Sequence, residues 1–202
     1  MKTVICLFAL LASSPAIAAE NMPVWKWVSA NEYYFILPVA QDLHLSGPGK
    51  TVSISPWGVG FRAVGNEAFS KTGGLQLQSI KVDNPTTGKD TFYLLELLLG
   101  MEYNSPKTQG KPFRYKASAF ADLGLSDTTL YAAPVLSAGL LYTTDEFADT
   151  PTGLTFDIFY RLTDIDLDNV GGGQAGTLKP ALGFKLGYIF EGFWTTKDKP
   201  KG

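Results

Sequence analysis

Residues 91–103 read TFYLLELLLGMEY, and two kinds of side chain alternate over the whole stretch. The odd positions are large and apolar, from Tyr93 to Tyr103, whereas the even positions include Glu96 and Glu102. A period of two over this length predicts a β-strand, because successive side chains of a strand point to opposite faces. One face of this strand is therefore expected to lie against an apolar medium, with a tyrosine at each end.

The same alternation recurs along the chain, for example over 113–125 and 154–162, and clusters of Gly, Pro, Asn and Asp separate the alternating stretches. Strands are predicted at 32–45, 51–64, 72–83, 91–103, 112–126, 129–143, 153–167 and 176–194. Long strands in this number favour a closed barrel. We therefore predict an all-β fold, an eight-stranded antiparallel barrel with up-and-down topology.

The N-terminus carries the pattern of a secretory signal peptide. Residues 4–12 (VICLFALLA) follow Lys2, and small residues precede a cleavage point after Ala18. The predicted organisation is a signal peptide at 1–18, an amphipathic segment at 19–31, the barrel at 32–194 and a polar tail at 195–202.

Two kinds of barrel fit the strands. A soluble lipocalin-like barrel has an apolar interior, whereas a membrane barrel has an apolar exterior with aromatic residues at the strand ends. Here the face opposite the apolar one mixes both charge signs with small residues such as Gly124 and Gly183, as a narrow lumen requires. We favour the transmembrane barrel, which the export signal assigns to a bacterial outer membrane.

Composition excludes several classes of function. The chain has 17 Lys and Arg against 19 Asp and Glu, which argues against a general nucleic-acid binder. Its one cysteine, Cys6, lies in the signal peptide, and its one histidine is His44. A disulfide, a thiol nucleophile and a clustered histidine zinc site are therefore excluded in the mature chain. We expect no metal, no cofactor and a monomer.

Pro38, Pro56 and Pro134 fall inside predicted strands. Proline has no backbone N–H and removes a hydrogen bond from the ladder. Two interpretations stay open: a bulge or strand end, or a lateral opening between strands through which a lipid tail enters the lumen.

The segment PWGVGF at 56–61 resembles the PWGxGF segment of the lipid A palmitoyltransferase (PagP) family. Further similarities lie in the same order as in that family. They are His44 downstream of Pro38, Asp83-Asn84 where the family has an Asp-Ser pair, the segment YAAPVL at 131–136, and PVWKW at 23–27.

The resemblance implies transfer of a palmitoyl-type chain from a phospholipid to lipid A, with both lipids as partners in the membrane. It implies that His44 is the general base, that Asp83 orients it, and that Asn84 is a third member of the site. Asn84 has no hydroxyl; it would donate a hydrogen bond to an oxyanion. Ser46, Ser53 and Ser55 lie close enough to His44 in sequence for one of them to substitute for the missing serine.

Further roles follow from the resemblance. Pro38, Pro56 and Pro134 would mark the access route for substrate, and Phe92 and Leu94 would line the acyl pocket.

The alternative is a non-enzymatic outer-membrane barrel: a degenerate relative, a small adhesin or a lipid-binding structural protein. An acyltransferase needs a vacant apolar cavity, whereas a structural barrel fills its lumen with paired charges. From their depths in neighbouring strands, we expect Glu96 and Glu102 to pair with Arg114 and Lys116.

Overall fold

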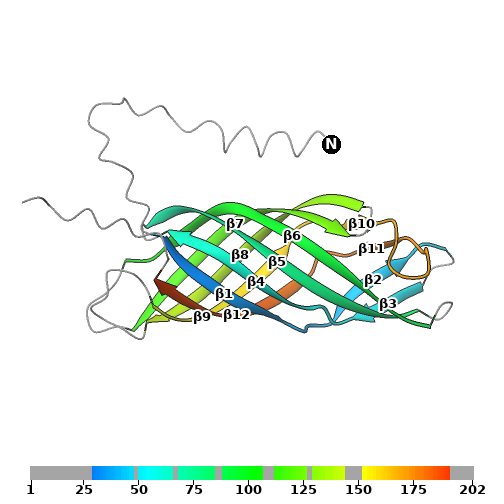
Figure 1. The fold of residues 1–202 in the computed structure, drawn as a ribbon, viewed down its shortest axis with the longest axis horizontal. Helices are drawn as coiled ribbons and strands as arrows, with labels where there is room; N and C mark the ends of the chain where they lie inside the picture. The colour runs from blue at the N-terminus through cyan, green and yellow to red at the C-terminus, as the bar shows by residue number, and fades with distance from the viewer. Residues whose placement is uncertain are drawn as a thin grey trace, which may run out of the picture.

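The structure, a computed structural model, describes residues 29–47, 50–65, 68–84, 88–106, 112–126, 129–143 and 152–191 (Figure 1). The predicted signal peptide at 1–18, most of the amphipathic segment and the polar tail at 195–202 lie outside the described residues.

Eight strands form a closed barrel, in the order β1-β12-β9-β8-β7-β6-β5-β4. Their bounds are β1 (Ser29–Leu37), β4 (Trp57–Gly65), β5 (Phe69–Asn84), β6 (Gly88–Asn104), β7 (Phe113–Ser126), β8 (Thr129–Thr143), β9 (Gly153–Arg161) and β12 (Leu182–Glu191). All neighbours are antiparallel, so the predicted up-and-down barrel is confirmed. Ala30 of β1 pairs with Glu191 of β12, and both ends of the barrel sequence therefore lie at one end, here called the terminal end.

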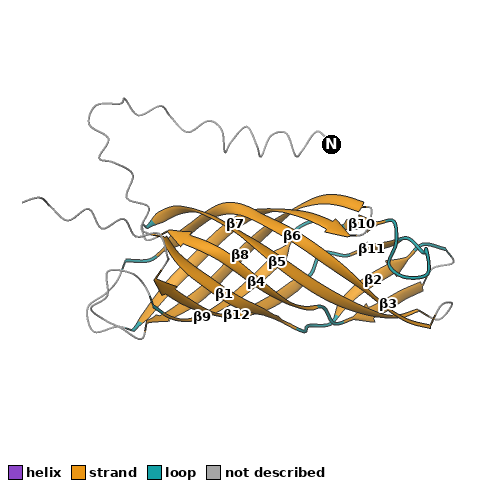
Figure 2. Ribbon diagram, in the orientation of Figure 1, coloured by secondary structure: helices purple, strands orange, loops and turns teal. Residues whose placement is uncertain are grey.

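The other end carries a second, four-stranded sheet in the order β10-β11-β2-β3, here called the cap sheet (Figure 2). Its strands are β2 (Gln41–Leu45), β3 (Lys50–Ile54), β10 (Ile165–Leu167) and β11 (Gly176–Leu178). The cap sheet faces the long extensions of β5 and β6 and completes the wall beyond the ends of β1, β4, β9 and β12 (Figure 1). We call this the cap end.

Four predicted strands are therefore each divided in two. Those at 32–45 and 51–64 break at 38–40 and 55–56, and those at 153–167 and 176–194 break at 162–164 and 179–181. Pro38 and Pro56 occupy two of these breaks, as the strand-end interpretation expects. Pro134 remains inside β8, where its carbonyl accepts a 2.9 Å hydrogen bond from Leu162 N just as β9 ends. The three prolines therefore lie at the height along the barrel at which β1, β4 and β9 end and the cap sheet begins to form part of the wall.

The outward side chains of the barrel are large, apolar and exposed, with the alternation that the sequence predicts. Examples are Phe35, Leu75, Leu97, Tyr115, Leu136, Phe156 and Leu186. Aromatic pairs lie towards the terminal end, where the ring centroids of Phe69 and Tyr103 are 4.9 Å apart and those of Phe113 and Tyr142 are 5.2 Å apart. Within the described ranges, no helix has the length and apolar character needed to cross a membrane.

The interior is layered. Apolar side chains fill the cap end between the cap sheet and the lumen faces of β5, β6 and β8. A second apolar layer lies within the barrel and includes Tyr34, Leu98, Phe120 and Phe159. Buried charged and amide side chains surround this second layer, and they form the candidate site.

Candidate functional site

Arg62 is the centre of a buried cluster of charges inside the barrel. It comes from β4 and is 2% exposed. Its Nε donates to Glu32 Oε2, its Nη1 lies 3.0 Å from Glu102 Oε2, and its Nη2 donates to Asp157 Oδ2 at 3.0 Å. One guanidinium therefore meets carboxylates from β1, β6 and β9, which lie around the barrel wall.

Lys116 of β7 supplies a second cation to the same cluster. Its Nζ lies 3.3 Å from Asp157 Oδ2 and 3.6 Å from Glu32 Oε1. The hydroxyl of Thr155 also donates to Glu32. Buried ions need partners and hydrogen bonds, since their desolvation is costly. This arrangement supplies them and fills that section of the lumen with protein.

Glycines make room for these side chains. A Cβ at Gly139 would lie 1.9 Å from Asp157 Oδ1, and one at Gly60 would lie 2.2 Å from the ring of Tyr34. Larger residues at these positions would occupy the space that the charges and rings fill. The requirement for this space explains why small residues occur at lumen-facing positions of the alternating strands.

A second polar group lies nearer the cap end and is centred on Glu96 of β6. Gln76 Nε2, Gln78 Nε2 and the Tyr131 hydroxyl donate to its carboxylate at 2.6, 2.5 and 2.7 Å. Glu96 is fully buried. Three donors from β5 and β8 hold this carboxylate in place.

Lys185 of β12 joins this group to the apolar layer. Its Nζ donates to Gln76 Oε1 at 3.1 Å and lies 4.6 Å from the ring centroid of Tyr34 and 4.9 Å from that of Phe159. The ammonium is therefore held by two aromatic faces and one amide oxygen.

The predicted pairing of Glu96 and Glu102 with Arg114 and Lys116 is wrong. Glu102 meets Arg62, Glu96 is bound by amides and a phenol, and Lys116 meets Asp157 and Glu32. Arg114 is half-buried, and its Nε donates to the Ser105 carbonyl at 2.9 Å. The prediction considered only neighbouring strands, whereas long side chains in a narrow barrel reach across the lumen.

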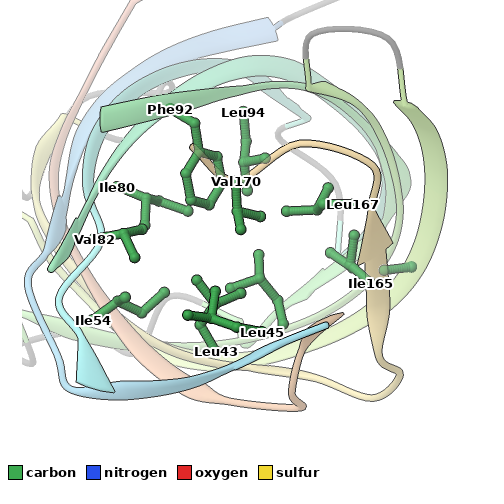
Figure 3. Packing of buried hydrophobic residues seen from close by; sticks show 12 residues of the cluster. Leu43, Leu45, Ile54, Ile80, Val82, Phe92, Leu94, Ile165, Leu167 and Val170 are labelled. Atoms are coloured by element: carbon green, nitrogen blue, oxygen red, sulfur yellow. The ribbon is translucent and has the colours of Figure 1, made fainter. Parts of the chain in front are cut away.

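The cap end is apolar, and Phe92 and Leu94 lie within it. Their side chains pack with Leu43, Leu45 and Val170 (Figure 3). Both residues predicted for an acyl pocket are thus part of an apolar cluster, in which side chains of this chain surround them.

The segment between β10 and β11 brings Val170 into this cluster, where it is fully buried. Gly171, Gly172 and Gly173 have φ values of 125°, 60° and 77°, which favour glycine. Asn169 Oδ1 accepts hydrogen bonds from Gly171 N and Gly173 N at 3.0 and 3.1 Å. The glycine run at 171–173 therefore forms a turn that places an apolar side chain in the cluster.

His44 lies on the outward face of the cap sheet and is exposed. It pairs with Thr177 and Thr51, while its neighbours Leu43 and Leu45 point inward to the apolar cluster. His44 therefore points away from Phe92 and Leu94. Asp83 is exposed near the end of β5, and the side chain of Asn84 lies outside the described part of the chain.

The serines considered as substitutes lie on the cap sheet or beside it. Ser46 Oγ donates to the Ala175 carbonyl at 2.8 Å, and Ser53 and Ser55 are exposed. Among the described residues, no group of three or more His, Cys, Asp or Glu side chains is placed to hold a metal ion.

Sequence reasoning missed the central member of the lumen cluster. Arg62 follows Phe61 in the PWGVGFR segment and occupies the opposite parity to Trp57, Val59 and Phe61, all of which are exposed. The available signal was the place of Arg62 in the alternation. Since the odd-numbered residues of this strand face outward, the even-numbered Arg62 is expected to face the lumen. The same criterion would have found Glu32, Asp157 and Lys185.

A closed barrel with an apolar exterior and a charged interior is a transmembrane β-barrel, and this chain is an outer-membrane protein. No protein-family model matches the chain, and no curated protein matches it.

Solved structures similar to this chain are outer-membrane proteins. The outer membrane protein OprG from Pseudomonas aeruginosa is 12% identical, with 85% of this chain and 100% of that chain covered and a TM-score of 0.49. Neisserial surface protein A is 14% identical, with 80% and 97% covered and a TM-score of 0.44. The attachment invasion locus protein Ail of Yersinia pestis is 11% identical, with 81% and 99% covered and a TM-score of 0.41.

At these identities and TM-scores, the fold is assigned from the pairing of this chain's own strands, which form the closed barrel described above.

Proposed function

We propose that this protein is a non-enzymatic outer-membrane barrel, a structural protein that binds lipid through its exterior. The observation that carries the proposal is the buried cluster around Arg62. Its ion pairs with Glu32, Glu102 and Asp157 fill the lumen with fixed charges. A lumen closed in this way serves stability and offers no open path for a solute.

The apolar cap end supports the same proposal. Val170 and Leu45 pack in the same cluster as Phe92 and Leu94. An acyl chain would have to displace these side chains before it lay beside Phe92. Interiors packed in this way resist such displacement, because each lost contact has a cost.

The orientation of His44 also favours a non-enzymatic protein. A general base has to lie within hydrogen-bond reach of the group that it deprotonates. His44 is exposed on the outward face of the cap sheet, between the inward-facing Leu43 and Leu45. A substrate whose tail occupied the apolar cluster would lie on the other side of the sheet.

Lipid A acyl transfer is the second candidate, and specific observations favour it. The PWGVGF segment begins at a break in the wall, and the exposed His44 and the apolar Phe92 and Leu94 lie at the same end of the barrel. In this alternative, lipid A and phospholipid are the substrates and Asp83 assists His44.

Mass spectrometry of lipid A from cells with and without the protein tests both candidates. We expect identical lipid A, and we expect no acyl transfer when purified protein is mixed with phospholipid and lipid A in vesicles. The matched variants are His44→Ala and Thr51→Ala, since these residues are cross-strand partners on one surface. Acyl transfer by the wild type that His44→Ala abolishes and Thr51→Ala retains would establish the enzyme instead.

A further inference from the structure

The apolar belt of this barrel differs in height from one side to the other. On β7 the outward apolar row runs from Phe113 to Leu125, and on β8 it runs from Leu130 to Tyr142. On the opposite side it runs from Tyr33 to Leu37 on β1. On β5 the continuous row runs from Gly73 to Leu77, and Lys71 separates it from the exposed Phe69 at the terminal end. Between them, β4 has a row from Trp57 to Ala63.

These rows correspond to different thicknesses of membrane. With a rise of about 3.3 Å per residue and a strand tilt of about 40°, the row on β8 spans roughly 30 Å along the barrel axis. By the same conversion the row on β4 spans roughly 15 Å and those on β1 and β5 roughly 10 Å. An outer-membrane barrel ordinarily presents a band about 25 Å tall.

Polar residues bound the short side. On β1 the residue two positions before Tyr33 is Asn31, which is polar and buried. On β5 the outward Lys71 is exposed on the terminal side of Gly73, and Lys81 is exposed on the cap side of Leu77. An exposed lysine within hydrocarbon is costly, so these lysines mark where the apolar environment ends.

The surface beyond the short side is also polar. The outward positions of β2 and β3 include Asp42, His44, Thr51 and Ser53, all of which are exposed. At the tip of the β7–β8 hairpin, by contrast, Leu130 is 80% exposed. The two sides therefore differ at the cap end as well as at the terminal end.

A tilt of the whole molecule does not remove this difference. Tilting moves both ends of a row in the same direction and leaves the length of the row unchanged. The bilayer adapts to a short apolar row by becoming thinner beside it, at a modest cost per ångström.

We propose that β1, β4 and β5 present a lipid-binding face that thins the bilayer locally, whereas β7 and β8 contact bilayer of full thickness. The partner of this face is the lipid itself, with hydrocarbon on the short row and headgroups on Lys71, Lys81 and the outward side of the cap sheet. The inference rests on the outer-membrane location and is independent of whether the protein is an enzyme.

Spin labels at two positions test this directly. Lys71 pairs with Met101, which pairs with Ala119 in the ladder row two strands away. Because the strands tilt by about 40°, Ala117, two residues nearer the terminal end of β7, lies at about the depth of Lys71 along the barrel axis and is the matched position. Lys71→Cys and Ala117→Cys, each with Cys6→Ser, would be labelled with a nitroxide and reconstituted in phosphatidylcholine vesicles. Collision rates with oxygen and with a neutral nickel chelate then report the depth of each label.

We expect the label at position 71 to collide severalfold more with the nickel chelate than the label at position 117, which should collide mainly with oxygen. A label at position 71 as deep in hydrocarbon as the one at 117 would overturn the proposal. So would a label that neither reagent reaches, because a protein surface would then cover this face.

Bilayer thickness provides a second test that needs no label. In vesicles from dilauroyl to dioleoyl phosphatidylcholine, the urea midpoint of the wild type should fall as the bilayer thickens. Lys71→Leu lengthens the short row and should reduce this fall, whereas Lys50→Leu, an exposed residue of the cap sheet, should leave it unchanged. Equal slopes for the wild type and Lys71→Leu would contradict local thinning.

Discussion

Arg62 and Asp157 are 95 positions apart, and Arg62 Nη2 donates a 3.0 Å hydrogen bond to Asp157 Oδ2 through the interior of the barrel. Their strands, β4 and β9, are not neighbours in the wall. The contact therefore links separate parts of the wall from inside. Together with the ion pairs to Glu32 and Glu102, it makes Arg62 the main counter-charge of three buried carboxylates.

Arg62→Leu should destabilise the barrel by about 3–5 kcal/mol, because it leaves buried carboxylates without their main counter-charge. Urea unfolding in detergent micelles or vesicles, followed by far-UV circular dichroism, measures the change.

Arg114→Leu is the matched control, since Arg114 is half-buried and its Nε donates to the Ser105 carbonyl. Its effect should be about 1 kcal/mol, the contribution of a typical hydrogen bond. Equal losses in the two variants would show that the cluster around Arg62 does not hold the barrel together.

Tyr131→Phe should destabilise the protein by about 1.5–3 kcal/mol, because it removes a hydrogen bond to the fully buried carboxylate of Glu96. The same unfolding assay measures it. Tyr142→Phe removes a hydroxyl from an exposed outward tyrosine and serves as control, with an expected effect near zero. A Tyr131→Phe variant as stable as the wild type would mean that Glu96 is held by its two amide donors alone.

Gly124→Ala should cost about 1–3 kcal/mol, the usual cost of overpacking. Its Cβ would lie 1.9 Å from the ring of Tyr131, so the ring has to move away from Glu96. Gly73→Ala is the control, because its Cβ would have no neighbour closer than 3.4 Å.

The double variant Gly124→Ala with Tyr131→Ala identifies the cause. Because Tyr131→Ala removes the ring that the new methyl group meets, Gly124→Ala should then have little further effect. Additive losses would indicate that the alanine acts elsewhere.

Much of the barrel was predictable from alternation. The apolar parity of 91–103, 113–125 and 154–162 correctly identified the outward face, because a lipid-facing strand has a strict requirement at every second residue. Arg62 shows the limit of this signal: its parity predicts that it faces the lumen but does not predict which carboxylates it meets. Those partners depend on side chains that reach across the barrel.

The division into two sheets was less predictable. The segment at 176–194 has an unbroken even-numbered apolar set, yet Leu178 faces the apolar cluster while Leu182 faces outward. Across the break at 179–181, the even-numbered side chains change from facing the interior to facing outward, although the apolar alternation in the sequence continues. Pro180 in this break and Pro38 in the corresponding one were the local signs, and proline alone does not distinguish a bulge from a change of sheet.

The assignment of catalytic residues depended on a resemblance and not on geometry. His44 follows Pro38 in the expected order, but the change of sheet between them sets the direction of its side chain. A prediction of one continuous strand through Pro38 could not show the direction in which the His44 side chain points.

Val170→Asp should open the cap end and leave the barrel folded. Val170 is fully buried in the apolar cluster, and the turn that carries it is held by hydrogen bonds from Gly171 N and Gly173 N to Asn169. A carboxylate there would lose its water without gaining a partner, a cost that local opening of the turn avoids. Hydrogen exchange should therefore accelerate in β10, β11 and their connecting turn, while the amides of β5 to β8 near Arg62 remain protected.

Asp168→Asn, two residues away, changes an exposed side chain and is the matched control. It should leave hydrogen exchange unchanged throughout the cap sheet, because the hydrogen bond that Asp168 makes to the described part of the chain comes from its backbone N–H, to Thr129 Oγ1 at 2.9 Å. Val170→Ala should give an intermediate result, with a loss of about 1–3 kcal/mol that reflects lost apolar burial without a buried charge. If Val170→Asp instead accelerated exchange equally in all strands, the cap sheet and the barrel would unfold as one cooperative unit. The division into two sheets would then not correspond to two regions of different stability.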